Sequence, residues 1–366
     1  MKRRTGRKLL WVTAYVVIWA VVIVCALEFW AAMMLRRGPA ILEEHQVKTA
    51  IRKVSEAFHT DLWAIPWKVY KPNATVSVVD DGTTYSTTIN GIGLRGPELV
   101  RTRGARIVVC LGGSTTVNGP SNDATYPALL EGILNESSPR RVVVVNGGVS
   151  ARLSEDYIHH LRQLMTTAWP DMVVEYNGAN DLCVKLIPQW KGRIGLVRRL
   201  LAKSRFVSYM FEEQLLPDEK QMRSDIRKYT IAHLKQSAEL LTGQGIKFAV
   251  CSFLRPELTS ESESWKKSYL DHDLRLSWRT GYVTYRSYRR MVDLYNDELR
   301  KAFADGEVRY LPLAETLQLR SHEFIDICHL TPVAIEKKAR AIAALIAADP
   351  QLAASDVSAT KNAEGQ

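Results

Sequence analysis

Four short polar stretches, scattered along the chain, together contain every group that a serine needs in order to attack an ester. The stretches are Gly112-Gly113-Ser114-Thr115, Asn146-Gly147-Gly148-Val149, Gly178-Ala179-Asn180-Asp181 and Asp326-Ile327-Cys328-His329. Acyl transfer of this kind requires a nucleophile, a base, an acid that orients the base, and donors for an oxyanion. The sequence therefore predicts serine-based ester chemistry that uses no cofactor and no metal.

The role of each residue follows from its chemistry. Ser114 is a poor nucleophile by itself, and His329, whose ordinary pKa is about 6.5, can accept its proton and return it to the leaving alcohol. Asp326 lies three residues before this base and can orient the imidazole. The predicted oxyanion donors are the backbone N–H groups of Ser114 and Gly148 and the side-chain amide of Asn180. Each stretch alone has a simpler explanation, namely a tight turn, a helix cap or a surface ion pair.

The elements that must position these residues are visible in the apolar pattern. Apolar, β-branched runs predict strands at 106–111, 142–146, 172–176, 246–252 and 307–311. Helices are predicted near 124–135, 154–168 (with Ser154 as the cap), 221–242, 284–303 and 332–347. This alternation indicates a parallel sheet, and the first three stretches lie just beyond the carboxyl ends of successive strands. Active-site crevices of open α/β sheets lie at these ends.

The order of the four stretches resembles that of the SGNH hydrolase superfamily, the GDSL-type esterases and lipases, from about Asn90 to about Ile346. The segment Asn90–Gly96 also resembles the one that opens many envelope-associated bacterial members. Two departures are Gly113, where an acidic residue is usual, and Pro332, with no glycine after the histidine stretch. The resemblance implies a flavodoxin-like, three-layer α/β/α fold with a five-stranded parallel sheet, and the catalytic roles given above.

An apolar segment near the N-terminus predicts a single transmembrane helix. Leu9 to Leu27 are nineteen residues without a charge, which span about 28 Å as a helix. Residues 1–37 carry seven basic residues against one acidic residue, so most of the net charge of +10 belongs to this anchor and not to a nucleic-acid face. The short basic tail favours a cytoplasmic N-terminus and an extracytoplasmic domain. A cleaved signal peptide is the alternative.

The chain is thus divided into a tail and anchor at 1–37, a juxtamembrane segment at 38–89, the main domain at 90–350 and a flexible tail at 351–366. The juxtamembrane segment includes a helix predicted around Leu42–Phe58 and a β-hairpin predicted from Thr75–Val79 and Thr83–Thr88. Two acidic–histidine pairs at helical spacing, Glu155 with His159 and Asp156 with His160, lack a third ligand and do not indicate a metal site.

The resemblance and the membrane anchor together suggest the substrate. We expect an ester in the cell envelope, such as an O-acyl group on a carbohydrate. The alternatives are a lysophospholipase or thioesterase, an acyltransferase that uses the same triad, and a non-catalytic envelope-binding module.

Two further features leave alternatives open. The link 185–205 carries seven basic residues, no acidic one and many interleaved apolar residues, which suits either a lid or anionic surface contact, or an ordinary packed helix. Cys183 follows the Asn180-Asp181 pair, and Cys328 lies between the predicted acid and base. They are either a disulfide that joins the two loops or two unpaired thiols.

Overall fold

The computed structural model describes residues 2–44, 63–64, 69–80, 83–100, 103–193, 195–258, 264–281, 283–304 and 306–353. Its centre is a five-stranded, entirely parallel sheet. In chain order the strands are β5 (Arg106–Gly112), β6 (Val142–Gly148), β7 (Met172–Tyr176), β8 (Lys247–Cys251) and β9 (Arg309–Leu311). In space the order is β6-β5-β7-β8-β9, which is the flavodoxin-like arrangement. The predicted fold class and all five predicted strands are confirmed.

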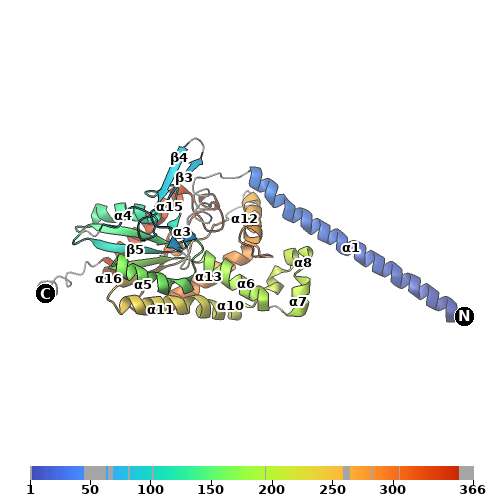
Figure 1. Ribbon diagram of the computed structural model, residues 1–366. Helices are drawn as coiled ribbons and strands as arrows, with labels where there is room; N and C mark the ends of the chain where they lie inside the picture. The colour runs from blue at the N-terminus through green and yellow to red at the C-terminus, as the bar shows by residue number, and fades with distance from the viewer. Residues whose placement is uncertain are drawn as a thin grey trace.

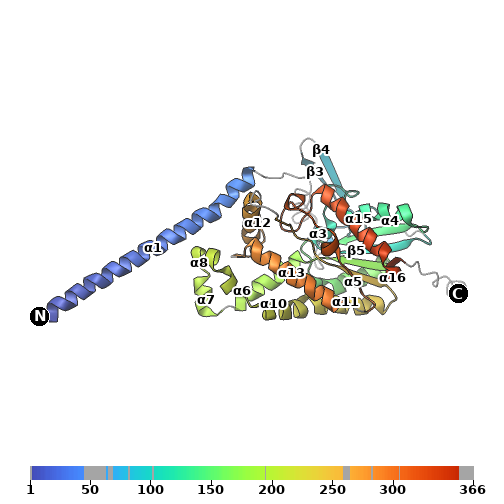
Figure 2. The same cartoon turned by 180° about the vertical axis from the view of Figure 1, so that it is seen from behind.

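Helices cover both faces of this sheet and make the three layers (Figures 1 and 2). On one face α4 (Tyr126–Ser137) packs against α15 (Pro332–Ala348). On the other, α5 (Tyr157–Thr167) packs against α11 (Ala232–Thr242), and α10 (Glu219–Ile226) packs against α13 (Tyr285–Ala302). The sheet residues between these layers form the main hydrophobic core, because the strands are apolar on both faces.

The helices differ from the prediction in several places. A π-helical turn, η3 (Arg227–Ile231), joins α10 to α11 within the stretch predicted as one helix. The helix α12 (Ser264–Leu276) was not predicted, because its sequence is too polar to show an apolar stripe. Ser154 does not cap the helix at 154–168; its N–H and hydroxyl both donate to Asp181 Oδ1, at 3.0 and 3.1 Å. This pairing ties the loop after β6 to the loop after β7.

The segment before the sheet packs onto the loops that follow β5 and β6. The predicted hairpin is present as β3 (Thr75–Asp80) and β4 (Thr83–Thr88), and β1 (Trp63–Ala64) pairs with β2 (Val69–Tyr70). Tyr70 and Ile89 are buried against Val117 and Val149. The Tyr70 hydroxyl also accepts a hydrogen bond from the Ser150 N–H at 2.7 Å. This segment therefore supports the loops that carry the predicted site.

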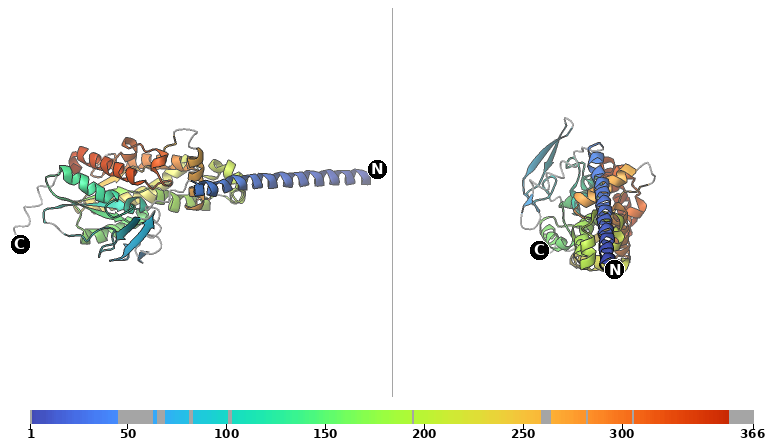
Figure 3. Two further views of the ribbon diagram at one scale, coloured as in Figure 1. Left: turned by 90° about the horizontal axis from the view of Figure 1, so that it is seen from above. Right: turned by 90° about the vertical axis from the view of Figure 1, so that its right-hand side faces the viewer.

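The N-terminal helix α1 (Lys2–Glu44) projects away from the sheet domain (Figures 1 and 3). Among the described residues, one helix, over Trp11–Met34, is long and apolar enough to cross a membrane, a test that a signal sequence also passes. Most of the helix predicted around Leu42–Phe58 lies outside the described residues. At its C-terminal end α1 contacts α8 (Arg205–Met210) and α12.

The remaining elements are short and connect those already described. They are α3 (Ser114–Val117), η1 (Ser154–Asp156), the π-helical η2 (Asp181–Leu186), α6 (Ile187–Arg193), α7 (Leu196–Leu201), α9 (Glu212–Leu215), α14 (Leu313–Thr316), η5 (Ser321–Glu323) and α16 (Pro350–Ala353). The predicted link 185–205 is therefore a series of short helices and not one long amphipathic helix.

Candidate active site

The carboxyl edge of the sheet brings the predicted nucleophile, base and acid into one hydrogen-bonded row. Ser114 begins α3 directly after β5, whereas Asp326 and His329 lie in the loop before α15. His329 Nε2 lies 2.8 Å from Ser114 Oγ, and His329 Nδ1 lies 2.6 Å from Asp326 Oδ2. With the proton on Nδ1, Nε2 is free to accept the serine proton. Residues from the two ends of the domain thus meet in the geometry that base-activated nucleophiles require.

The acid also holds the shape of the loop that carries the base. Asp326 Oδ1 accepts the backbone N–H groups of Cys328 and His329, both at 2.8 Å. The loop closes where the N–H of Ile325 donates to the His329 carbonyl at 2.8 Å. On the outer side, the Trp278 ring stacks on the imidazole, with centroids 6.5 Å apart. The base is therefore fixed on several sides before any substrate binds.

The two ionisable members of this row shift each other's pKa in opposite directions. Burial alone would lower the pKa of His329, but the charge and hydrogen bond of Asp326 outweigh it, so the pKa of His329 is raised above its ordinary value. Burial would likewise raise the pKa of Asp326, yet its bonds to His329 and the loop N–H groups hold that pKa well below its usual range. The pair therefore favours a charged carboxylate and stabilises the imidazolium that forms when the base takes a proton.

The turn that presents the serine is packed tightly against the loop after β7. A Cβ on Gly113 would lie 2.3 Å from Asn180 Nδ2, so the amide of Asn180 lies directly against this turn. Any side chain at Gly113 would therefore displace that amide. From the other side, buried Arg95 donates to the Val117 carbonyl at 2.7 Å and to the Gly119 carbonyl at 3.0 Å. Arg95 belongs to the lead-in segment 90–96, which thereby holds the end of α3.

The three predicted oxyanion donors are placed differently. The Ser114 N–H has no acceptor among the described residues, and the Asn180 amide uses one N–H on the Arg152 carbonyl at 3.1 Å, which leaves its second N–H. The Gly148 N–H instead donates to Asn146 Oδ1 at 3.1 Å. A Cβ on Gly148 would lie 2.4 Å from the Val117 N atom, so this glycine allows α3 to pack closely on β6. The structure does not present Gly148 as an open donor.

Another N–H group in the same loop has no acceptor among the described residues. In the loop after β6, the N–H groups of Val149, Ser150 and Arg152 all have acceptors. The Ala151 N–H has none among the described residues, and Ala151 has a φ of 56°, an uncommon conformation for a side chain with a Cβ. It directly precedes Arg152, whose carbonyl holds the Asn180 amide. No feature of the sequence pointed to this residue, since the side chain of alanine has no functional group.

A buried lysine behind the nucleophile was also missed. Lys338 of α15 is 1% exposed, and its Nζ donates to the Thr115 carbonyl at 3.0 Å. The same Nζ lies 3.8 Å from the centre of the Tyr126 ring and 3.5 Å from that of Tyr176. Burial lowers the pKa of this ammonium well below its ordinary value. One feature of the sequence could have indicated that Lys338 is buried, namely its position within the apolar stripe of the helix predicted at 332–347.

The cysteines of the two catalytic loops are not bonded. Cys183 and Cys328 are both free and buried. Burial raises the pKa of each thiol well above its ordinary value, so both remain protonated near neutral pH. Of the two expectations, the structure matches that of two unpaired thiols, so no disulfide joins the two loops.

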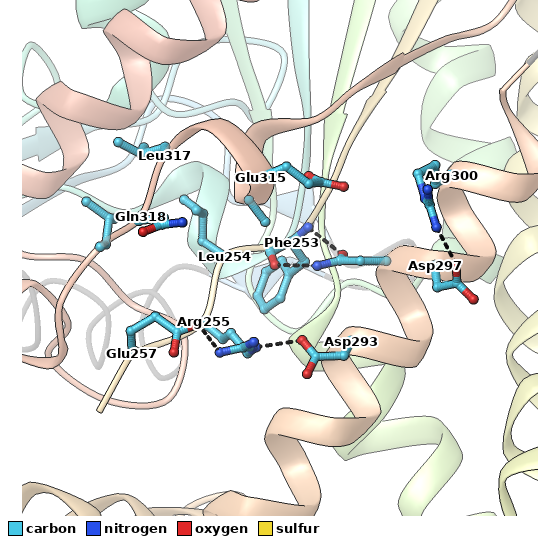
Figure 4. Close-up of a pocket in the computed structure, with 13 residues that line it drawn as sticks. Phe253, Leu254, Arg255, Glu257, Asp293, Asp297, Arg300, Glu315, Leu317 and Gln318 are labelled. Carbon is cyan, nitrogen blue, oxygen red and sulfur yellow. Dashed lines mark hydrogen bonds and ion pairs between the residues drawn. The ribbon is translucent and has the colours of Figure 1, made fainter. Parts of the chain in front are cut away.

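A cavity of about 360 Å³ lies beside the carboxyl ends of β8 and β9, and the triad does not line it. Figure 4 shows that charged side chains lining the cavity form ion pairs with one another. Arg255 Nε lies 2.8 Å from Asp293 Oδ1, and Arg300 Nη2 lies 2.8 Å from Asp297 Oδ1. Because these charges already have partners, the cavity adds no group to the reaction at Ser114.

Comparison with known proteins gives structural matches only. No protein-family model matches the chain, and no curated protein is similar to it. A solved protein described as a lipolytic member of the G-D-S-L family, from Desulfitobacterium hafniense, matches 65% of this chain and 98% of its own, with 11% identity and a TM-score of 0.41. An extracellular lipase from Streptomyces rimosus matches 65% of this chain and 98% of its own, with 15% identity and a TM-score of 0.39. An acetylxylan esterase from Geobacillus stearothermophilus matches 66% and 93%, with 15% identity and a TM-score of 0.36.

At these identities and TM-scores the matches carry no argument about function, which rests on the geometry of the site.

Proposed function

We propose that the protein is a membrane-anchored serine ester hydrolase that removes O-acyl groups from a carbohydrate of the cell envelope. The observation that carries the proposal is the hydrogen-bonded row from Asp326 through His329 to Ser114. The distance from Asp326 Oδ2 to His329 Nδ1 is 2.6 Å, and that from His329 Nε2 to Ser114 Oγ is 2.8 Å. Neither a surface ion pair nor a helix cap requires a serine hydroxyl on the second imidazole nitrogen. A base-activated nucleophile does.

The reaction proceeds through an acyl-enzyme. Ser114 Oγ attacks the ester carbonyl while His329 Nε2 takes its proton, and the same proton then goes to the leaving alcohol. Water repeats the sequence on the acyl-enzyme and releases the carboxylic acid. Throughout, Asp326 remains ionised and stabilises the imidazolium, in keeping with its lowered pKa.

The oxyanion that forms in each half-reaction needs donors that are already in place. The backbone N–H of Ser114 and the free N–H of the Asn180 amide supply two. We assign the third to the backbone N–H of Ala151, since the predicted donor, Gly148, already donates to Asn146. Donors that are oriented before the charge develops stabilise it without reorganisation during the reaction.

The membrane anchor and the orientation are part of the same proposal. The apolar part of α1, Trp11–Met34, crosses the membrane, and the basic residues before Leu9 keep the N-terminus in the cytoplasm. The sheet domain then lies on the extracytoplasmic side, where acylated envelope carbohydrates are within reach. α12 lies between α3, which carries Ser114, and the part of α1 that projects from the domain (Figures 1 and 2). Because this separates the nucleophile from the proposed membrane span, an acylated carbohydrate is favoured over a lipid as the substrate.

The test is a panel of esters with acyl chains from acetyl to palmitoyl, together with O-acetylated polysaccharides, measured on the full chain in detergent. The full chain is needed because α1 packs on α8 and α12. We expect acetyl esters to be hydrolysed fastest and acetate to be released from polysaccharide. The Ser114→Ala variant is the matched control and should release none.

Other outcomes separate the alternatives. Preference for long acyl chains would identify a lysophospholipase or thioesterase, and transfer of the acyl group to an added sugar in preference to water would identify an acyltransferase. A protein that binds envelope polysaccharide but turns over no ester would be a binding module, and the proposal would be wrong.

A further inference from the structure

The C-terminal part of the apolar span of α1 contacts α8, a helix of the sheet domain. Glu28, within the apolar span, accepts hydrogen bonds from the hydroxyl of Ser204 and from the backbone N–H groups of Arg205, at 2.9 Å, and Phe206, at 3.4 Å. These groups form the N-terminal end of α8, where a carboxylate is favourable. Glu28, a charged residue within an otherwise apolar segment, therefore fixes the position of α8 along the axis of α1.

Aromatic packing reinforces this joint. The Trp30 ring meets the Phe206 ring edge-on at 6.3 Å and the Tyr209 ring at 5.7 Å. Ala31, one residue further along α1, is fully buried. The contact places α8 beside the C-terminal part of the Trp11–Met34 span, and α7 lies with it at the end of the domain that faces the N-terminus of α1 (Figures 1, 2 and 3).

α7 exposes large apolar side chains. Leu196 and Val197 are 72% and 71% exposed, and Leu200 and Leu201 are 55% and 47% exposed. Basic residues stand among them: Arg198 and Lys203 make no ion pair with any described residue, and the chain from Lys185 to Phe211 contains no acidic residue. Contiguous exposed apolar side chains among unpaired cations mark an interaction surface, and the pattern is typical of helices that lie in a membrane interface.

We propose that α7 and α8, which we call the platform, rest on the anionic surface of the membrane that α1 crosses. The apolar side chains of α7 enter the headgroup region while Arg198 and Lys203 contact lipid phosphates. This inference rests on the proposed membrane anchor. The occupant is a bilayer because the joint with α1 holds the platform next to the span and because its unpaired charges are all positive. Together with α1, this second contact fixes the orientation of the catalytic edge above the membrane.

The test uses the full chain, one copy per nanodisc, with a fluorescent label at a single cysteine. Leu200→Cys in a Cys25→Ser background reports on α7, and Glu136→Cys on α4 in the same background is the control away from the platform. The native Cys25, which is exposed on α1, reports whether the helix is inserted; the other cysteines are buried. Quenching by a lipid-attached nitroxide and by aqueous iodide is compared in discs of phosphatidylcholine, with and without phosphatidylglycerol, at low salt.

We expect the Leu200→Cys label to be quenched by the lipid nitroxide and shielded from iodide in anionic discs, and the Glu136→Cys label to show the reverse. Arg198→Glu with Lys203→Glu should abolish the lipid quenching, whereas the matched reversal Lys220→Glu with Lys235→Glu should not. Iodide access to the Leu200→Cys label in every disc would overturn the proposal. So would shielding that is independent of anionic lipid and survives the reversal at Arg198 and Lys203, because the chain itself would then cover α7.

Two controls separate this proposal from those it rests on. A Cys25 label that the lipid nitroxide does not quench would overturn the anchor and the platform together. Hydrolysis of a small soluble ester should be unchanged by the reversal of Arg198 and Lys203. If no variant hydrolyses an ester while α7 still contacts lipid, the platform stands and the enzymatic proposal falls.

Discussion

The catalytic edge of the sheet and the platform of α7 and α8 are built in opposite ways. At the catalytic edge, Ser114 is 4% exposed, and residues distant in the sequence are held by hydrogen bonds of 2.6 to 3.1 Å. In the platform, Leu196 is 72% exposed, and the fixed contacts are those of α8 with α1. The first region is complete without a ligand. The second leaves the apolar side chains of α7 exposed.

Preorganisation and exposure are thus divided between two parts of one chain. Chemistry on an ester needs donors and a base that do not move, so that region has many internal bonds. Contact with a fluid surface needs side chains that remain open until the surface is present. Substitutions should therefore act on turnover in the first region and on placement in the second.

Removing the nucleophile or the base should have the largest effect. Ser114→Ala and His329→Ala should each lower kcat by roughly 10⁴- to 10⁶-fold, and the double variant should be no slower than either single variant, because the two residues act as one unit. Circular dichroism should show an intact fold for all three. Steady-state hydrolysis of an activated acetyl ester is the measurement, and additive losses would show that the two side chains act separately.

Removing one oxyanion donor should have a smaller effect. Asn180→Ala should lower kcat on the order of a hundredfold with little change in KM, since the lost hydrogen bond forms mainly in the transition state. Asn146→Ala removes the acceptor of the Gly148 N–H and should leave kcat close to that of the wild type. A rise in kcat in Asn146→Ala would show that the Gly148 N–H, once released from Asn146, serves the oxyanion, and would weaken the assignment to Ala151.

The pH dependence should reveal the paired base. His329 must be neutral to accept the proton from Ser114, and Asp326 raises its pKa above its ordinary value of 6.5. The value of kcat/KM should thus be constant at alkaline pH and fall about tenfold per pH unit as the pH drops through a pKa above 6.5. The measurement is a pH–rate profile with a substrate that does not itself titrate. An acidic limb below pH 6 would contradict the coupling to Asp326.

The buried lysine should affect stability more than chemistry. Lys338→Ala leaves a void between two tyrosine rings and should lower the free energy of unfolding by about 2–4 kcal/mol. Lys338→Met keeps most of the volume and removes the charge, and should cost less than about 1.5 kcal/mol. Urea denaturation of both variants measures the difference. Equal losses in the two variants would show that the bond to the Thr115 carbonyl matters more than packing.

The sequence predicted the parts of this molecule that local pattern controls. Five β-branched runs predicted the five strands because buried parallel strands are apolar on both faces. Since parallel strands end at one edge, the same pattern predicted that Ser114, Gly148 and Asn180 would lie there, with Asp326 and His329 after the fifth strand. The structure places Ser114, His329 and Asp326 within hydrogen-bonding distance of one another in a row. The sequence did not predict the features that depend on packing between distant segments.

Three residues show this limit. A glycine after β6 looked like an open N–H donor, but the direction of the Gly148 N–H is set by Asn146 and by the approach of α3. Ser154 looked like a helix cap, but Asp181, from the loop after the next strand, competes for its hydroxyl. No prediction covered Lys338, because the local sequence does not show the two tyrosine rings that enclose it. Each partner lies on another element, so a local pattern cannot reveal it.

Covalent labelling tests the central claim most directly. The full chain in detergent is treated with a fluorophosphonate, digested, and the modified residue is located by mass spectrometry. We predict stoichiometric modification of Ser114, no modification in Ser114→Ala, and slow modification in His329→Ala, because the hydroxyl has then lost its base. Labelling elsewhere, or no labelling of folded protein, would show that Ser114 is not an activated nucleophile.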